Sequence, residues 1–359
     1  MSHGKAKSRH QLDEARYRHE LGEVSPSVRR GEPIVKAFVT GATGFVGSAV
    51  VRSLLRRGSA VKVLARRTSD LRNIADLDVE VFYGDLPDGD GLTSALKGCD
   101  TLYHVAAYYS TAEADSQMMY EVNVRGTKAI MHAALRAGVQ RVVHTSTIGT
   151  IGQPLDGTLA TEETPFNLWD RGSHYVKSKY LAELVALNMC NRGLPVVVVN
   201  PCAPVGPRDI KPSSTGQRIL DYLHGRQPSF VPGGINFVSV QDVAEGEVLA
   251  AGRGRVGQRY ILGNKDGNLL LPDFLALIER VSGVSRPHTA RHPLSVLRLG
   301  RRKARNGTLE TGSSKDFRPM ALTCDPSKAI RELGLPQTPL ETAFAEAVAW
   351  FRENGYIRA

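Results

Sequence analysis

Three glycines, each separated from the next by two residues, constrain the fold of this chain more than any other feature. Gly41, Gly44 and Gly47 follow an apolar segment at 35–40 and lead into an apolar stripe of helical spacing that stops at Gly58. In such a strand–turn–helix unit the first glycine permits the sharp turn, the second lets the backbone approach a pyrophosphate, and the third lets helix and strand pack closely. The free N–H groups of the helix N-terminus then face the anion. The segment therefore predicts dinucleotide binding.

Between residues 34 and 203, short β-branched runs alternate with longer segments of helical periodicity. This alternation is typical of parallel βαβ units. Several runs are nearly all apolar, as expected of strands that helices cover on both faces. The predicted fold is α/β, a Rossmann-type doubly wound parallel sheet. We expect its strands at 35–40, 60–64, 79–83, 101–106, 141–145 and 195–199.

The regular alternation ends after Pro201, and five prolines between residues 204 and 232 mark a region of loops and short elements. An apolar pattern of helical spacing over 338–352 predicts a helix that closes the chain. We therefore divide the chain into three parts. These are a charged N-terminal arm at 1–33, an NAD(P)-binding Rossmann domain at 34–202 with later returns from the C-terminal half, and a smaller, mainly substrate-binding C-terminal lobe at 203–359.

Composition narrows the class of protein. The 359 residues carry a net charge of +10, which draws attention to polyanionic partners. Aromatic residues make up only 6% and no nucleic-acid-binding motif is present, so we expect a small-molecule substrate and no nucleic acid. No apolar run reaches the roughly 18 residues of a membrane-spanning helix. The four scattered cysteines form no CxxC pair, which predicts no metal site and a reducing, cytoplasmic setting.

The end of the second predicted strand bears on the choice between NAD and NADP, because it lies beside the adenosine ribose in such folds. NAD enzymes usually place Asp or Glu there, whereas this chain has Arg66 and Arg67 and no carboxylate before Asp70. A guanidinium suits the charge and geometry of a 2′-phosphate. NADP(H) is therefore favoured. NAD(H) stays open as the alternative, in which both arginines are solvated surface cations.

Tyr175 and Lys179 stand four residues apart and so share one face of a predicted helix. A free phenol has a pKa near 10 and exchanges protons poorly at neutral pH, and a nearby ammonium stabilises the phenolate and lowers that pKa. Thr145, Ser146 and Thr147 supply three hydroxyls at the end of the fifth predicted strand. We select Thr147 as the third catalytic residue.

The chain resembles the extended short-chain dehydrogenases/reductases, the NAD-dependent epimerase/dehydratase family. The resemblance implies that Thr147 binds the substrate oxygen, that Tyr175 exchanges its proton, and that Lys179 holds the nicotinamide ribose and Tyr175. Residues 200–212 look most like the hopanoid-associated sugar epimerases, which are similar to dihydroflavonol reductases. The motifs that carry the resemblance are the glycine turn, 104–107, 123–127, the Tyr175/Lys179 pair, 200–201, 237–244 and 350–351.

The motifs and the resemblance together assign the remaining site residues. Tyr109, after the fourth predicted strand, and Asn200 are candidate substrate contacts. The predicted cofactor contacts are Gly41, Thr43, Gly44, Phe45, Val46, Arg66, Asp85, Leu86, Val105, Ala106, Ala107, Asn123, Thr145, Tyr175, Lys179 and Pro201.

Three functions follow from these assignments. The leading one is NADP(H)-dependent reduction of a ketone or aldehyde of a small-to-medium organic substrate, with Tyr175 as proton donor, as in dihydroflavonol reductase-like proteins. The alternative is a nucleotide-sugar epimerase or dehydratase with retained NAD, in which Asn200 meets the diphosphate and the basic segment 298–305 adds phosphate contacts. The third is a dinucleotide-sensing protein without turnover.

Two further expectations come from the resemblance. Relatives pair through the helices that match 116–137 and 175–191, which implies a homodimer. Residues 292–305 are basic here, whereas the hopanoid-associated group tends to be apolar in this part of the substrate lobe. The identity of the substrate therefore does not carry over.

Overall fold

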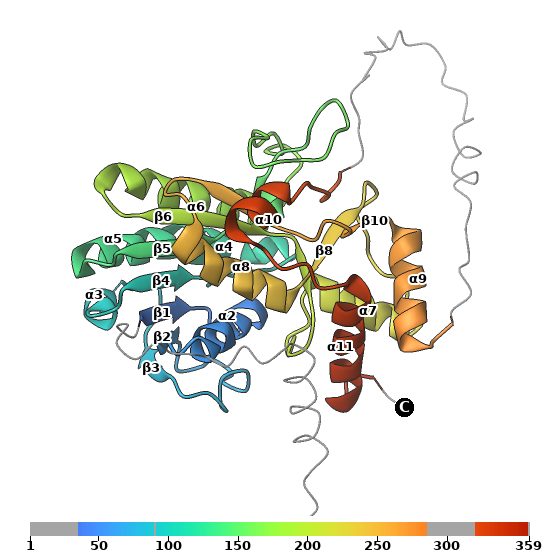
Figure 1. Ribbon diagram of the computed structural model, residues 1–359, viewed down its shortest axis with the longest axis horizontal. Coiled ribbons are helices and arrows are strands. Elements are labelled where there is room, and N and C mark those ends of the chain that lie inside the picture. The colour runs from blue at the N-terminus through green and yellow to red at the C-terminus, as the bar shows by residue number, and fades with distance from the viewer. Residues whose placement is uncertain (1–34, 90, 286–319, 358–359) are drawn as a thin grey trace, which may run out of the picture.

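The computed structural model describes residues 35–89, 91–285 and 320–357. Within them the chain forms a seven-stranded parallel sheet and a smaller three-stranded sheet (Figure 1). The N-terminal arm and the basic segment 298–305 lie outside the described residues. The order of the large sheet is β3-β2-β1-β4-β5-β6-β9. The chain reverses its direction of winding between β1 and β4, which is where ligands bind in open sheets of this kind.

All six predicted strands are present, and the Rossmann-type fold is confirmed. The fourth strand ends at His104, two residues earlier than predicted, because the chain turns there toward the glycine turn. A seventh strand that the sequence did not predict, β9, pairs with β6. The strands are β1 Lys36–Thr40, β2 Ala60–Ala65, β3 Glu80–Tyr83, β4 Thr101–His104, β5 Arg141–Thr145, β6 Val196–Pro201 and β9 Arg259–Leu262.

Helices cover both faces of the large sheet (Figure 1). On one face, α2 (Phe45–Arg56) packs against α8 (Val240–Arg253) over one apolar core. On the other face, α3 (Leu92–Leu96), α5 (Thr127–Ala137) and α6 (His174–Asn188) enclose a second core. Among the described residues, none of the helices combines the length and apolar character needed to cross a bilayer. The sheet is thus buried on both sides, as its apolar strands require.

Short helical segments connect these strands and helices. A 3-10 turn η1 (Glu113–Asp115), helix α4 (Ser116–Tyr120) and a π-helical turn η2 (Glu121–Gly126) lead into α5. The 3-10 turn η3 (Ile148–Thr150) follows β5, and η4 (Met189–Arg192) extends α6.

The smaller lobe is built around the second sheet, ordered β10-β8-β7. The closing helix predicted over 338–352 begins at Leu340, because Pro339 stands at its N-cap. Three elements from the part of the chain predicted to form this lobe belong to the larger domain instead. Strand β9 joins the large sheet, and helices α8 and α10 (Ser327–Leu333) pack against it. The elements of the lobe are β7 Ala203–Val205, β8 Ile235–Ser239, β10 Asn268–Leu269, α7 Ser214–Leu223, α9 Leu271–Ser282 and α11 Leu340–Glu353.

An aromatic cluster forms the core of the smaller lobe. Phe274 of α9 is fully buried and stacks on Phe237 of β8 with ring centroids 5.2 Å apart. Phe344 of α11 meets both rings edge-on, and Phe230 completes the cluster. Aromatic packing of this kind joins three elements that are distant in sequence.

Replacing Phe274 with alanine is expected to lower the free energy of unfolding by about 3–5 kcal/mol, because it removes buried area and leaves a cavity. Urea unfolding followed by circular dichroism measures the change. Leu155→Ala is the control, since Leu155 is 78% exposed and its truncation should stay within about 0.5 kcal/mol. Equal effects of the two substitutions would contradict the assignment of Phe274 to the core.

Candidate active site

The glycine turn lies between the ends of β1 and β4. Gly41 has φ +73°, a left-handed conformation that favours glycine, and a side chain on it would approach the backbone nitrogen of Ala106 to 2.7 Å. A side chain on Gly47 would lie 2.1 Å from the carbonyl oxygen of Gly41. Close backbone approach therefore requires both glycines.

The N-terminus of α2 fits a dinucleotide. Its N-cap, Gly44, makes no side-chain cap hydrogen bond, and no acidic residue occupies the first turn. The first N–H groups of the twelve-residue helix are therefore free to meet an anion. Thr43, Phe45 and Val46 lie in or next to this turn, as the predicted pyrophosphate contacts require.

A chain of hydrogen bonds ties β1 and β4 to α5. The Oγ1 atom of Thr40 lies 2.8 Å from Nδ1 of His104, whose Nε2 lies 2.9 Å from Oγ1 of Thr127. Since the Thr127 hydroxyl donates to the carbonyl oxygen of Asn123, it must accept from His104, which places the imidazole proton on Nε2. Burial lowers the pKa of His104 to about 3, so the ring is neutral. These hydrogen bonds thus hold β1 and β4 together next to the glycine turn.

Asn123 fixes the segment that follows β4. Its side-chain nitrogen donates to the carbonyl oxygen of Tyr108 and to Oγ of Ser178, each at 3.0 Å, and its Oδ1 accepts from the Tyr108 nitrogen at 2.7 Å. The Ser178 hydroxyl donates to the carbonyl oxygen of Tyr175. Asn123 is buried, so these bonds give it a positioning role between the segment after β4 and helix α6. A contact with the cofactor stays a prediction.

Helix α6 carries the two catalytic candidates of the Tyr/Lys pair. Ser173 caps it, with its Oγ accepting from the nitrogen of Val176. Lys179 is 2% exposed, and its Nζ donates to the carbonyl oxygen of Thr145 at 2.6 Å. This bond joins the first turns of α6 to the end of β5.

Thr147 lies two residues beyond that carbonyl, at the N-cap of η3. Its hydroxyl oxygen accepts from the nitrogen of Gly149 at 3.3 Å. A side chain on Gly149 would approach Val176 of α6 to 3.0 Å, so the turn is packed directly against the helix beside Tyr175. The structure therefore brings Thr147, Tyr175 and Lys179 to the same end of β5 and α6, as predicted.

Tyr175 meets the ring of Tyr109 edge-on, with centroids 4.9 Å apart and planes at 83°. Burial raises the pKa of the Tyr175 phenol, and Tyr109 adds to the rise. The expectation that Lys179 lowers this pKa is wrong, because burial of the phenol raises it, and the Lys179 ammonium donates to the Thr145 carbonyl. The Tyr175 ring thus packs against Tyr109 at the start of α6.

Two buried glutamates act against the effect of burial on the pKa of Lys179. Burial lowers its pKa to about 8, and the charges of Glu183 and Glu247 act in the opposite direction. Glu247 of α8 approaches from the other face of the sheet, where the Thr145 hydroxyl donates to its Oε1 at 3.0 Å. Burial raises the pKa of Glu247 to about 8, and its Oε2 has no partner among the described residues. Thr145 thus links the two groups through its carbonyl and its hydroxyl.

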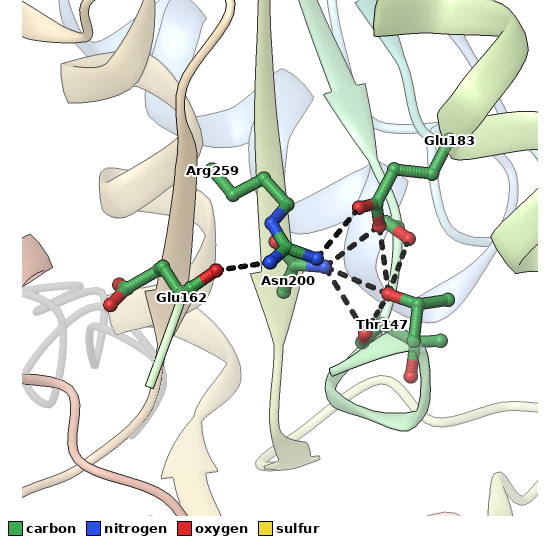
Figure 2. A network of polar contacts seen from close by, with 7 residues as sticks. Thr147, Glu162, Glu183, Asn200 and Arg259 are labelled. Carbon is green, nitrogen blue, oxygen red and sulfur yellow. Dashed lines mark hydrogen bonds and ion pairs between the residues drawn. The ribbon is translucent and has the colours of Figure 1, made fainter. Parts of the chain in front are cut away.

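Asn200 belongs to a network behind Thr147 (Figure 2). It is fully buried, and its side-chain nitrogen lies 2.9 Å from Oγ1 of Thr150, 3.0 Å from Oε2 of Glu183 and 3.3 Å from the carbonyl oxygen of Thr147. Arg259 of β9 donates to Oε1 of Glu183 and to the carbonyl oxygen of Glu162. These bonds brace the Thr147 turn, which gives Asn200 a positioning role.

The sequence reasoning missed most of this network. Glu183 follows Lys179 by four residues, so helical spacing was an available signal for it. Arg259 and Glu162 come from a strand and a loop whose approach depends on tertiary structure, and no local pattern marks them.

The other predicted cofactor contacts lie at the carboxyl ends of the strands, the edge where ligands bind in such sheets. Arg66 is the exposed residue after β2, and its guanidinium has no partner among the described residues. Oδ1 of Asp85 accepts from the nitrogen of Leu86 after β3, and Leu86 is buried against Gly126. The remaining contacts end or follow β4, β5 and β6: Val105, Ala106, Ala107, Thr145 and Pro201.

Fold and site together define an enzyme of the extended short-chain dehydrogenase/reductase type. Residues 37–263 match the NAD dependent epimerase/dehydratase family, and the chain belongs to it. Members of this family bind a nicotinamide dinucleotide, as solved structures with bound NAD illustrate.

Similar proteins include reductases. A putative dihydroflavonol 4-reductase from Synechocystis sp. is 39% identical over 89% of this chain and 96% of its own length. Sterol demethylase protein B from Methylococcus capsulatus is 40% identical over 89% of this chain and 99% of its own. The crystal structure of DesIV, a dTDP-glucose 4,6-dehydratase from Streptomyces venezuelae with NAD and TYD bound, is 28% identical, covers 90% of this chain and 99% of its own, and has a TM-score of 0.73.

Glu247→Gln is expected to change the pH dependence of stability. The pKa of Glu247 is about 8 in the folded protein against an ordinary value of 4.5, so the folded state keeps a proton that the unfolded state releases over this interval. The wild-type free energy of unfolding therefore falls as pH rises through this range, and the variant lacks that contribution.

Urea unfolding at several pH values between about 5 and about 8 measures the difference. The variant should gain stability relative to wild type as pH rises. Glu353→Gln, at an exposed position of α11, is the control and should run parallel to wild type. If the free energy of unfolding of Glu247→Gln changes with pH in the same way as that of wild type, Glu247 is ionised over the whole pH range measured.

Proposed function

We propose that this enzyme uses NADPH to reduce a ketone or aldehyde carbonyl of a small-to-medium organic substrate. The observation that carries the proposal is the arrangement of Thr147, Tyr175 and Lys179 at the end of β5, where Lys179 donates to the Thr145 carbonyl. A reduction needs a proton donor at the carbonyl oxygen, and the Tyr175 phenol is the group in this arrangement that can supply the proton. The reductases among the similar proteins also support the reduction of a carbonyl group.

The proposed mechanism divides the work among three side chains. When bound along the carboxyl edge of the sheet, NADPH supplies hydride to the carbonyl carbon. The Thr147 hydroxyl holds the carbonyl oxygen, and the Tyr175 phenol gives its proton to that oxygen as the alcohol forms. Lys179 would hold the nicotinamide ribose, with its ammonium held in place by the Thr145 carbonyl and the charge of Glu183.

The alternative of a nucleotide-sugar epimerase or dehydratase with retained NAD has less support. It relies on Asn200 meeting a nucleotide diphosphate, whereas the amide nitrogen of Asn200 already donates within the protein and its side chain is fully buried. The dehydratase DesIV is also less similar in sequence, at 28% identity, than the reductase-named relative at 39%.

We also propose that the enzyme works in the cytoplasm as a homodimer. All four cysteines are free, and the sulfurs of Cys202 and Cys324 lie 3.3 Å apart without a disulfide, which suits a reducing setting. The large apolar side chains of Met118 on α4 and Leu184 on α6 are about half exposed, which supports pairing through these helices.

Tyr175→Phe tests the proposed chemistry. Loss of the phenol proton should reduce turnover of an aryl ketone about 10²–10⁴-fold while NADPH binding stays unchanged. NADPH consumption by absorbance and NADPH affinity by fluorescence titration measure the two effects. Tyr180→Phe, five residues along α6 where the ring stacks on Phe166, is the matched control and should keep full activity. Full activity in Tyr175→Phe would rule out Tyr175 as the proton donor.

Arg66→Ala tests the cofactor. Because the exposed guanidinium after β2 is proposed to meet the 2′-phosphate, its removal should weaken NADPH binding about tenfold and leave NADH binding unchanged. Calorimetric titration of both nucleotides measures this. Arg136→Ala on α5, whose guanidinium bonds Thr93, is the control for a general loss of positive charge. Tighter binding of NADH than NADPH by wild type, or equal weakening of both by the substitution, would contradict NADP preference.

A further inference from the structure

Helix α7 begins beside the proposed proton donor. The hydroxyl oxygen of Ser214, the first residue of α7, lies 2.6 Å from the hydroxyl oxygen of Tyr109. The Tyr109 ring in turn packs edge-on against Tyr175 and is 52% exposed. The start of α7 is therefore separated from Tyr175 by a single side chain.

Arg218 follows Ser214 by four residues and so lies on the same face of α7. It is half-buried, and its Nε donates to the carbonyl oxygen of Ser229 at 2.7 Å. This bond anchors the guanidinium and leaves the two outer nitrogens available. Burial lowers the pKa of Arg218, and Tyr109 acts in the opposite direction. Arginine stays charged despite such a shift.

No acidic side chain balances Arg218 among the described residues. The acid closest to it along α7, Asp221, is paired with Arg226 at 2.8 Å. A half-buried cation without an anion is costly, and a bound anion offsets that cost. The outer edge of a guanidinium has the fork of donors that matches the two oxygens of a carboxylate. Arg218 thus has the charge, the donors and the location of a substrate-recognition group.

We propose that Arg218 binds a carboxylate on the substrate, so that the substrate is a keto acid whose carbonyl faces Tyr175 and whose carboxylate faces α7. The inference rests on the proposed function and adds a substrate class to it. Arg218 and Tyr109 together select the substrate, and the catalytic residues act at its other end.

Paired probes test the inference. The three acetylbenzoate isomers and 4-acetylphenylacetate, each beside its methyl ester, vary the separation of ketone and carboxylate while the ester removes the charge. With NADPH and the full-length enzyme, at least one acid should exceed its ester in kcat/KM by about tenfold. Arg218→Gln should abolish the preference by raising KM for the acid, while kcat/KM for the esters stays unchanged. Arg218→Lys should keep part of the preference. Arg226→Gln, at an exposed cation near the end of the same helix, should keep it in full.

The outcomes separate the two proposals. If wild type oxidises NADPH with neither acids nor esters, the proposed reduction fails and the inference fails with it. If acids and esters are reduced equally by wild type, or if Arg218→Gln slows both equally, carboxylate recognition is wrong while the reduction stands. Thermal melting checks that Arg218→Gln folds, and Arg218→Lys gives the answer on its own if it does not.

Discussion

The bond from the Lys179 ammonium to the Thr145 carbonyl is the contact on which the candidate site depends. A buried ammonium is costly unless acceptors meet it, and here the Thr145 carbonyl at 2.6 Å and the charge of Glu183 do so. Lys179 is four residues from Tyr175, and Thr145 is two residues from Thr147. This bond therefore sets the position of α6 along β5 and, with it, the relative positions of all three catalytic candidates.

The rest of the site is arranged around the same end of the sheet. The Asn200 network supports the Thr147 turn from behind, and Asn123 holds the segment that carries Tyr109 against α6. The glycine turn lies at the neighbouring pair of strands, with its helix N-terminus uncapped by a side chain. The proposed dinucleotide binding and proton donation thus lie at adjacent strand ends, as expected where the winding of a parallel sheet reverses, and helix α7 with Arg218 begins beside them.

Local patterns predicted the features that depend on local structure. The glycine turn, six strands and the Tyr175/Lys179 spacing were all present in the sequence because a turn, an apolar strand and a helical face each leave a short periodic signature. Strand β9 and Arg259 were missed because their positions depend on packing that no short segment encodes. The direction of the Tyr175 pKa shift was predicted wrongly, since helical spacing brings Lys179 near the phenol but does not reveal that the phenol is buried beside Tyr109.

Following a deuterium label at C4 of NADPH tests the central claim, net reduction at this site, most directly. The reaction is run with a ketone substrate, and mass spectrometry of both products locates the label. The account predicts one deuterium on the carbinol carbon of the alcohol for each NADP⁺ released. An unlabelled product with the nucleotide still bound and its redox state unchanged would contradict it, and would indicate hydride return within one turnover.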